Sequence, residues 1–568
     1  MHVDVVPNRG SKPTVLLRES YREGKRVHKR TLGNISGLPD DQIDLLRRVL
    51  KGERLVNAEE FFGISRSWHH GGVEAVLTAM RGLGFDELLG SRPTRERQLV
   101  KAMIAARVLE PQSKLATTRT WETTTLPAEL GVTDATEDEL YNAMDWLLER
   151  QDRIEQRLAA RHLDEQSLVL YDLSSTYFEG KTCPLAALGY NRDGKAGKLQ
   201  VNFGLVTNRD GCPVGVSVHS GNTGDPKTLL PQLRRIREVF GVFRLVMVGD
   251  RGMISQKQID AFLEDGAVDW ISALRSVSIA KLRQAGTLQM GLFDERNLFE
   301  ISHPDFPHER LIACRNPALA KLRAHKRNEL IEATRKELDR IQVRVGRGRL
   351  QGRASIGVAA GRVINRYKVA KHFRLRIDDN QMRYVVRKSR IDAEAALDGV
   401  YIIRTSVPKE KMSAEDAVRN YKRLTGVERA FRGMKTIDIK VRPVHHRLAD
   451  RVRAHIFLCM LAYYVEWHLV NAWRPLLFTD EEIDTKDLRD PVAPARRSAK
   501  AQAKAAAHTL ADGAPVHSLR TLLKDLASIV RNRCHRKGSG PEEATFELTT
   551  TPNPQQRRAL DLAATIRV

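Results

Sequence analysis

The sequence is poor in cysteine and has no long apolar run. Its five cysteines are scattered and form neither a CxxC pair nor the spacing of a zinc site, so we expect a reducing cytoplasm, no disulfides and no structural zinc. The most apolar stretch, Ile456–Val465, is far shorter than the roughly 20 residues that span a bilayer. It is typical of a buried core helix, and we expect no membrane segment. The first residues also contain no apolar run of signal-peptide length.

Acidic residues are in deficit. Asp and Glu number 70 against 94 Lys and Arg, which gives a net charge of +24 and a pI of about 9.9. This balance disfavours a small neutral substrate as the main partner and favours a polyanion, with nucleic acid ahead of a membrane surface. The 568 residues have room for two to four domains, and 42% hydrophobic content allows each a core.

The N-terminal part divides into a basic hairpin and a helical region. Residues 14–34 predict two short strands around a turn at 22–25, and the hairpin either grips phosphates or is an ordinary solvated one. From 41 to 162 apolar residues recur at helical spacing, and Thr136 and Glu139 form a capping box at the start of one helix. We therefore expect an all-α N-terminal domain that binds DNA, although it shows no helix-turn-helix signature.

At Ser167 the pattern changes to strands. The expected order is β-β-β-α-β-α-β, over residues 167–172, 199–207, 212–219, 225–240, 243–249, 256–265 and 268–274. Asp225 is expected to cap the first of these helices and Pro226 to open it.

After Leu274 this order is interrupted for about 140 residues. Residues 321–376 hold 17 Lys and Arg against 4 Asp and Glu, and the pattern predicts an exposed amphipathic helix that Gly346 and the following residues end. A basic run is usually a solvated face, but this one is dense enough to favour a DNA-binding insertion. Helical pattern returns over 413–434, and residues 484–513 are typical of a linker or loose helix, followed by a short periodic segment at 516–530.

Three acids fall where a metal site built on strands would need them. Asp172 lies in the first strand, Asp250 follows the fourth, and Glu428 lies on a helix that can pack beside the sheet. Neighbouring strands are under about 5 Å apart, so the two aspartates can converge on hard cations. Two Mg²⁺ ions about 4 Å apart would activate a water or a 3′-hydroxyl and stabilise the leaving oxygen of a phosphate. By itself the triplet is weak evidence, because the chain has many acids.

The residues around these acids carry a resemblance. Segments 171–180 (YDLSSTYFEG), 221–225 (GNTGD) and 248–252 (VGDRG) resemble the DDE-type transposases of bacterial insertion sequences. One bacterial group of them has a Tyr-x2-Arg-x3-Glu-x6-Lys signature, which Tyr421, Glu428 and Lys435 match. The arginine position is Leu424 here, and Arg423, Arg429 or Arg432 would have to supply that contact.

The resemblance implies an α/β fold with an RNase H-like catalytic core that a basic insertion interrupts. With the pattern described above it gives these expected regions: 1–40 the basic hairpin, 41–165 the helical DNA-binding domain, 166–275 the first part of the core, 276–412 the insertion, 413–475 the second part with the Glu helix, and 476–568 a C-terminal region for dimerisation.

The resemblance also implies an activity and its parts. We expect a bacterial, nucleoid-associated transposase that cuts DNA at the inverted repeats of its element and joins the 3′-hydroxyl ends to target DNA as a homodimer. Asp172, Asp250 and Glu428 would be both catalytic residues and ligands of two Mg²⁺ ions, with Mn²⁺ as an alternative. The expected DNA contacts are Tyr421, Arg423, Arg432 and Lys435 around the Glu helix, and Arg344, Arg347, Arg349 and Arg353 in the insertion, which should lie beside the active site.

Two details and two alternatives stay open at this point. Trp270 would stack on an unpaired base, or it is a core residue of its strand. Tyr421, Glu428 and Lys435 are seven residues apart, about two helical turns, and are expected to share a face. The alternative functions are an RNase H-like nuclease without strand transfer and a catalytically inactive DNA-binding protein.

Overall fold

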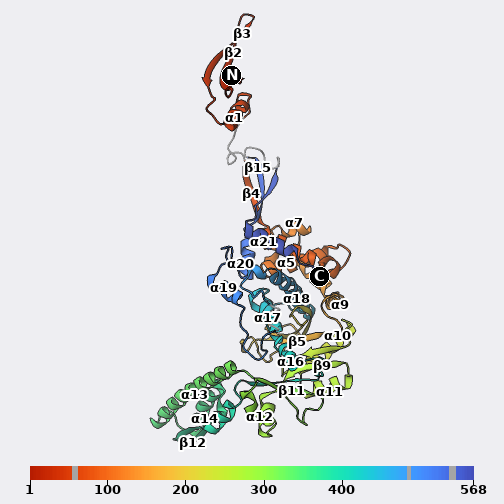
Figure 1. Cartoon of the computed structure of the whole chain (residues 1–568). Helices are drawn as coiled ribbons and strands as arrows, with labels where there is room; N and C mark the ends of the chain where they lie inside the picture. The colour runs from red at the N-terminus through yellow and green to blue at the C-terminus, as the bar shows by residue number, and fades with distance from the viewer. Residues whose placement is uncertain (54–61, 483–487, 537–544) are drawn as a thin grey trace. The chain divides into compact units, whose positions relative to one another are not determined.

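The computed structural model describes residues 1–53, 62–482, 488–536 and 545–568. These residues divide into two compact units (Figure 1). Unit 1 combines Met1–Trp68 with Val530–Thr550, and unit 2 combines His69–Ile529 with Thr551–Val568. The C-terminal region that we predicted as 476–568 therefore contributes to both units.

Unit 1 contains two small antiparallel sheets and a helix. The first sheet has the order β1-β2-β3, with β1 His2–Val6, β2 Thr14–Glu23 and β3 Arg26–Asn34. The hairpin predicted around residues 22–25 is confirmed, and β1 is a strand that the sequence pattern did not reveal. Helix α1 spans Asp40–Leu50.

The second sheet of unit 1 corrects the prediction that residues 41–165 are all helical. Its order is β16-β15-β4, with β4 Phe62–His69, β15 Val530–Arg536 and β16 Phe546–Thr549. β4 is stabilised by a partner strand more than 450 residues away in the chain, and no local pattern contains that information.

Helices form the first part of unit 2. They are α3 Gly71–Gly82, α4 Phe85–Leu89, α5 Arg95–Leu109, α6 Lys114–Trp121, α7 Leu126–Leu130, α8 Glu137–Leu148 and α9 Gln151–His162. Helix α8 starts with the predicted capping box, in which Glu139 and Thr136 bond each other's backbone N–H groups.

Among the described residues, unit 2 also holds an eight-stranded mixed sheet in the order β10-β11-β14-β9-β8-β5-β6-β7. The predicted β-β-β-α-β-α-β order is confirmed. Its elements are β5 Leu168–Tyr177, β6 Gln200–Thr207, β7 Pro213–Ser220, α10 Asp225–Glu238, β8 Leu245–Val248, α11 Gln256–Asp265 and β9 Val268–Ala273. β8 lies parallel to both β5 and β9, whereas β6 is antiparallel to β5 and β7. Gly224, and not Asp225, is the N-cap of α10.

The insertion adds three strands to this sheet, which the sequence did not predict. β14 Val400–Thr405 pairs antiparallel with β9, β11 Arg310–Arg315 pairs with β14, and β10 Leu298–Ile301 forms the edge. Helix α12 spans Ser276–Gln284. Hydrophobic residues of α12, β11 and β14 form a core cluster of their own.

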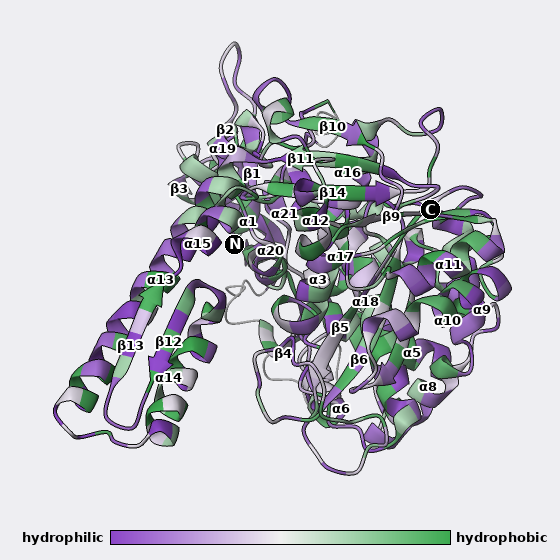
Figure 2. Ribbon diagram, turned by 90° about the horizontal axis from the view of Figure 1, so that it is seen from below, coloured by the Kyte–Doolittle hydropathy of each residue, from purple (hydrophilic) through white to green (hydrophobic). Residues whose placement is uncertain are grey.

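The basic part of the insertion is an arm with a separate core, which Figure 2 shows as a projection from the sheet. Its elements are α13 Pro317–Gly346, α14 Arg353–Tyr367, β12 Phe373–Ile377, β13 Met382–Val386 and, at its base, α15 Lys388–Ala395. Helix α13 ends at Gly346, as predicted. Near the base the guanidinium of Arg327, only 8% exposed, donates two hydrogen bonds to Asp398 at 2.9 and 2.6 Å.

The predicted helix over 413–434 consists of two helices. α16 Ala414–Lys422 and α17 Leu424–Arg432 meet at Arg423, and a π-helical turn, Gly433–Ile437, follows. Helix α18 Ala449–Ala472 is buried over most of its length, as expected. The remaining helices are α19 Ala499–Ala507, α20 Leu519–Leu526 and α21 Pro554–Ala564. The start of the predicted linker at 484–513 lies outside the described residues.

No helix among the described residues is long and apolar enough to cross a membrane. All five cysteines are buried free thiols.

Candidate active site

The pairing of β5 with β8 sets two aspartates at the same level of the sheet. In this parallel pair Leu170 lies opposite Val248. Asp172 and Asp250 each lie two residues further on, and residues two apart in a strand face the same side. With neighbouring strands about 4.8 Å apart, the register brings the two carboxylates together.

The turn after β8 holds the Asp250 carboxylate. Its Oδ1 accepts hydrogen bonds from the backbone N–H groups of Gly252 and Met253, at 2.8 and 2.7 Å. The hydroxyl of Ser272 on β9 donates to the Asp250 carbonyl oxygen at 3.2 Å. These bonds fix the orientation of the Asp250 side chain. They involve Oδ1 and not Oδ2.

Asp172 carries an unfavourable charge. Burial raises its pKa to about 7, and the carboxylates of Asp250 and Asp225 push in the same direction. The Leu173 N–H, which donates to Asp172 at 2.8 Å, and the cation of Arg192 oppose the rise. A divalent cation between Asp172 and Asp250 would remove both the desolvation and the repulsion.

Helix α17 brings the third acid to this group. It packs on β5 through buried Val427 and Phe431, and the Phe431 ring contacts Phe203 of β6 at a centroid distance of 5.3 Å (Figure 1). Glu428 is exposed beside this buried face. The charges of Asp250, Glu428 and Asp172 all act on the Tyr421 hydroxyl, so the structure gathers the three acids around one side chain.

The Tyr421 hydroxyl lies under the influence of these three acids. Burial raises the pKa of Tyr421 to about 12, and the carboxylates of Asp250 and Glu428 add to the rise while Arg251 opposes it. The phenol therefore keeps its proton near neutral pH.

Lys435 does not share a face with Glu428, which corrects the prediction from spacing. The break at Arg423 and the π-helical turn after α17 shift the helical phase, so that Lys435 is 8% exposed whereas Glu428 faces solvent. The Lys435 ammonium donates to Asp193 at 3.0 Å, and Arg442 contacts the same carboxylate at 2.7 Å. Burial holds the pKa of Lys435 below its usual value.

The sequence analysis missed the loop between β5 and β6. Asp193 in this loop accepts the backbone N–H of Tyr177 at 3.0 Å as well as the two cations, so it ties the end of β5 to the segment after α17. Its neighbour Arg192 forms an ion pair with Asp225 and acts on Asp172. No spacing rule links Asp193 to partners more than 240 residues away.

Two predicted DNA contacts lie at the ends of α17. Arg423, between α16 and α17, forms an ion pair with Asp210 at 3.3 Å, and its side chain is 20% exposed. Arg432, in the last turn of α17, is exposed. Arg432 lies on the same short helix as Glu428, and Arg423 directly precedes that helix.

Trp270 is a core residue, and its predicted stacking on a base is wrong. Its side chain is 1% exposed in β9 and lies 6.0 Å, centroid to centroid, from the Phe262 ring of α11. A side chain buried on this scale has no face for a nucleotide.

The four arginines of the insertion lie at the tip of the arm. All are exposed: Arg344, Arg347, Arg349 and Arg353. Asp379 of the β12–β13 turn accepts the Arg353 backbone N–H at 3.1 Å, which closes the tip. The 30 residues of α13 rise about 45 Å from the base. The expectation that this part of the insertion lies beside the carboxylates stays a prediction.

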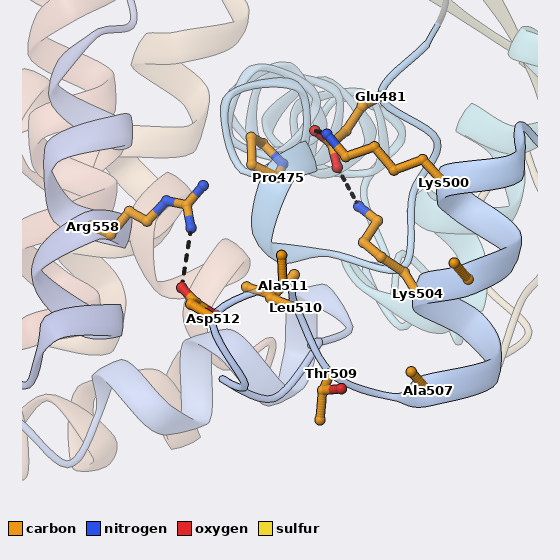
Figure 3. Close-up of a pocket in the computed structure, with 11 residues that line it drawn as sticks. Pro475, Glu481, Lys500, Lys504, Ala507, Thr509, Leu510, Ala511, Asp512 and Arg558 are labelled. Carbon is orange, nitrogen blue, oxygen red and sulfur yellow. Dashed lines mark hydrogen bonds and ion pairs between the residues drawn. The ribbon is translucent and has the colours of Figure 1, made fainter.

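A separate pocket of about 440 Å³ lies between α19 and the segment that follows it (Figure 3). None of the three acids lines it. Its charged groups already pair with one another, Lys504 with Glu481 at 2.7 Å and Arg558 with Asp512 at 3.7 Å. These ion pairs are typical of a structural pocket.

A second set of potential metal ligands joins His162, Cys212 and His468, whose ligand atoms lie within 4.8 Å of one another. The His162 Nε2 is hydrogen-bonded with the Tyr464 hydroxyl at 2.9 Å, and Cys212 Sγ lies 3.9 Å from His468 Nε2. These contacts hold the three side chains together within the core. The prediction that the protein has no structural zinc is not tested by them and stays a prediction.

The comparisons with known proteins identify the family. A family model described as "Transposase DDE domain" matches residues 168–465, over half of the chain, and "IS1634 family transposase, N-terminal domain" matches residues 3–60. The chain belongs to the DDE transposases of insertion sequences, as the resemblance implied. Members of this family generally use divalent metal ions.

Similarity to solved structures is low. A piggyBac transposase synaptic complex with hairpin DNA aligns over 80% of this chain and 79% of that one, with 9% identity and a TM-score of 0.33. A Mos1 transposase paired-end complex with the left transposon end aligns over 34% of this chain and 62% of that one, with 12% identity and a TM-score of 0.15. A search of curated proteins gave no match.

Proposed function

We propose that this transposase binds the terminal inverted repeats of its own element, cleaves the ends and joins the freed 3′-hydroxyls to target DNA. The observation that carries the proposal is the gathering of Asp172, Asp250 and Glu428 around Tyr421, within the segment that matches the DDE domain. We further propose that it acts on nucleoid DNA as a homodimer.

We infer that β5 to β9 form an RNase H-like core. The strand order β7-β6-β5-β8-β9, with only β6 antiparallel to the rest, supports this assignment. On this reading residues 276–412 are the insertion, and 413–475 complete the core with the Glu helix.

The three acids fit a pair of Mg²⁺ ions, with Mn²⁺ as an alternative. The donor set is all carboxylate oxygen, which these hard cations prefer, and the raised pKa of Asp172 reflects a negative charge that lacks compensation. When bound, the metal would polarise the scissile phosphate and activate a water or 3′-hydroxyl. Asp172, Asp250 and Glu428 would be its ligands and thereby the catalytic residues.

The protein's own groups then position the DNA. The protonated Tyr421 hydroxyl would donate to a phosphate oxygen beside the carboxylates, and Arg423 and Arg432 would flank the strand at the two ends of α17. Lys435, which is paired with Asp193, would contact a phosphate of the DNA backbone. Arg344, Arg347, Arg349 and Arg353 would hold a more distant stretch of duplex.

A cleavage and joining assay tests the proposal. Full-length protein is incubated with a duplex that carries one end of the element encoding it and with a supercoiled target plasmid, in Mg²⁺, Mn²⁺ or EDTA. We expect metal-dependent nicking at the element end and joined products from the wild type, and neither from Asp172→Asn, Asp250→Asn or Glu428→Gln. Asp260→Asn, a change of the same kind at an exposed position of α11, should behave as the wild type.

Three outcomes would contradict the proposal in different ways. Cleavage without any joined product would identify a nuclease without strand transfer. Specific binding with no cleavage in any metal would identify an inactive DNA-binding protein. Full activity of Asp172→Asn would remove the catalytic assignment.

A further inference from the structure

Two buried cations in the helical part of unit 2 have no hydrogen-bond or ion-pair partner among the residues that the structure describes. Lys114, the first residue of α6, is 5% exposed, and Arg107 of α5 is 7% exposed. Within the described part of the chain, neither side chain donates a hydrogen bond or enters an ion pair. A charge buried in this way is costly unless an opposite charge compensates it.

The groups that act on these two cations are basic, apart from the buried Cys459 thiol, whose pKa burial raises. Arg107 and Lys114 act on each other and on His446 and His455, and Arg451 and His445 act on His446. Burial and, to a smaller extent, the charge of Arg107 lower the pKa of Lys114 to about 7. Burial also lowers the pKa of His446 to about 3. No carboxylate is among the groups that act most strongly on Lys114, His446 or His455.

Other buried cations of this protein are paired, so the arrangement is not general to the fold. Lys101, on the same helix as Arg107 and 7% exposed, contacts Asp86 at 2.8 Å. Arg327 binds Asp398, and Lys504 binds Glu481. Arg107 and Lys114 therefore differ from these cations in having no counter-charge among the described residues.

The start of α6 favours an anion at the same place. Ser113 caps the helix by accepting the Ala116 N–H at 3.1 Å, and the first-turn N–H groups carry the positive end of the helix dipole. His445, next to His446, is exposed at the surface.

We propose that Arg107, Lys114 and the N-terminus of α6 bind one phosphate of the DNA backbone. The inference rests on the proposed function, which supplies DNA as the source of the phosphate. It assigns one specific contact to the helical region that we expected to bind DNA. Contact with a backbone phosphate positions DNA without reading its sequence. The negative charge of the phosphate would also compensate the buried charge of Lys114.

The test compares Lys114→Met with Lys101→Met in the full chain. Methionine keeps the length and the apolar stem of lysine, so both variants remove one buried charge at similar volume. We expect Lys114→Met to weaken DNA binding at low salt and to reduce the log–log salt slope by about 0.9, the value for one phosphate contact. Its melting temperature should rise, because the uncompensated charge is gone. Lys101→Met should keep the wild-type slope.

The outcomes separate this inference from the proposed function. If the wild type binds DNA and Lys114→Met has the same affinity and slope, the inference is wrong; a melting temperature below that of the wild type also overturns it. If the wild type binds no DNA, the proposed function fails, and inorganic phosphate at constant ionic strength becomes the probe. A rise in melting temperature that the wild type shows and Lys114→Met lacks would then support a phosphate pocket, and equal behaviour would overturn it.

Discussion

Asp172 illustrates how one residue couples stability to the candidate chemistry. Its pKa of about 7 lies well above the ordinary value near 3.9 of an exposed aspartate. Between about pH 4 and pH 7 the Asp172 side chain is therefore protonated in the folded protein and ionised in the unfolded chain. Asp172 favours the folded state below about pH 4, and this contribution is lost as the pH rises through 7.

Asp172→Asn should therefore stabilise the metal-free protein at pH 8 more than at pH 5. After allowance for solvent screening, the gain at pH 8 is roughly 1–3 kcal/mol. Thermal melting of the wild type and the variant in EDTA at the two pH values measures it. Adding Mg²⁺ or Mn²⁺ should raise the melting temperature of the wild type and have less effect on the variant. An equal gain at both pH values would contradict the charge argument.

Tyr421 provides a second test at the level of a single group. Its raised pKa keeps the phenol protonated, and Tyr421→Phe removes that donor while keeping the ring. We expect the cleavage rate to fall about 100-fold, as for loss of one donor to a developing oxyanion, with little change in DNA affinity. Tyr401→Phe, another half-buried tyrosine, on β14, is the matched control. A normal rate for Tyr421→Phe would exclude it from contact with the reacting phosphate.

At the scale of elements, local pattern was informative and long-range pairing was not. The strands β5 to β9 and the helix pattern around Glu428 follow from hydrophobic periodicity. The positions of Asp172 within the first strand and of Asp250 after the fourth follow with them. The strands β14, β11 and β10 depend on partners beyond the reach of any sequence window. The ion pairs of Asp193 and the phase shift at Lys435 depend on a kink and a π-helical turn, which no spacing rule predicts.

The arm makes a prediction that depends on DNA length. Its tip is about 45 Å from its base, whereas DNA rises about 3.4 Å per base pair. Changing Arg344, Arg347, Arg349 and Arg353 together to Ala should flatten the salt dependence for a long duplex, by about 0.9 for each phosphate that the variant no longer binds, on specific and random sequence alike. A duplex of about 10 base pairs should be bound as by the wild type.

The controls for the arm use charges that are already paired. Arg335 and Arg340 lie on the same helix and contact Glu332 and Glu337, so changing them to Ala should have a smaller effect on DNA binding. Light scattering without DNA would show whether the arm instead packs against a second subunit. An unchanged salt slope for the four-arginine variant on long DNA would remove the arm from the DNA interface.

At the scale of the whole molecule, we expect DNA binding and catalysis to be carried by different charges. More than half of the net charge of +24 lies in residues 321–376, whereas the three acids lie near one another elsewhere in the chain. EDTA should therefore abolish cleavage and leave DNA affinity within a few-fold of its value in Mg²⁺, and Asp172→Asn should bind at least as tightly as the wild type. Gel-shift titrations beside cleavage assays on the same samples measure both. Parallel loss of binding and cleavage in EDTA would contradict this separation.

β14 pairs with β9 but is synthesised much later, so the sheet cannot be completed until the ribosome has added the insertion. Glu428 follows Asp250 by 178 residues, which a ribosome adds in about 9–36 s. During that interval the nascent chain already contains both aspartates, but the edge of β9 still lacks its neighbour and β5 still lacks α17. Chains released early would carry many of the cations proposed to bind DNA and only two of the three proposed metal ligands. On the proposed function, such chains would bind nucleic acid without cleaving it.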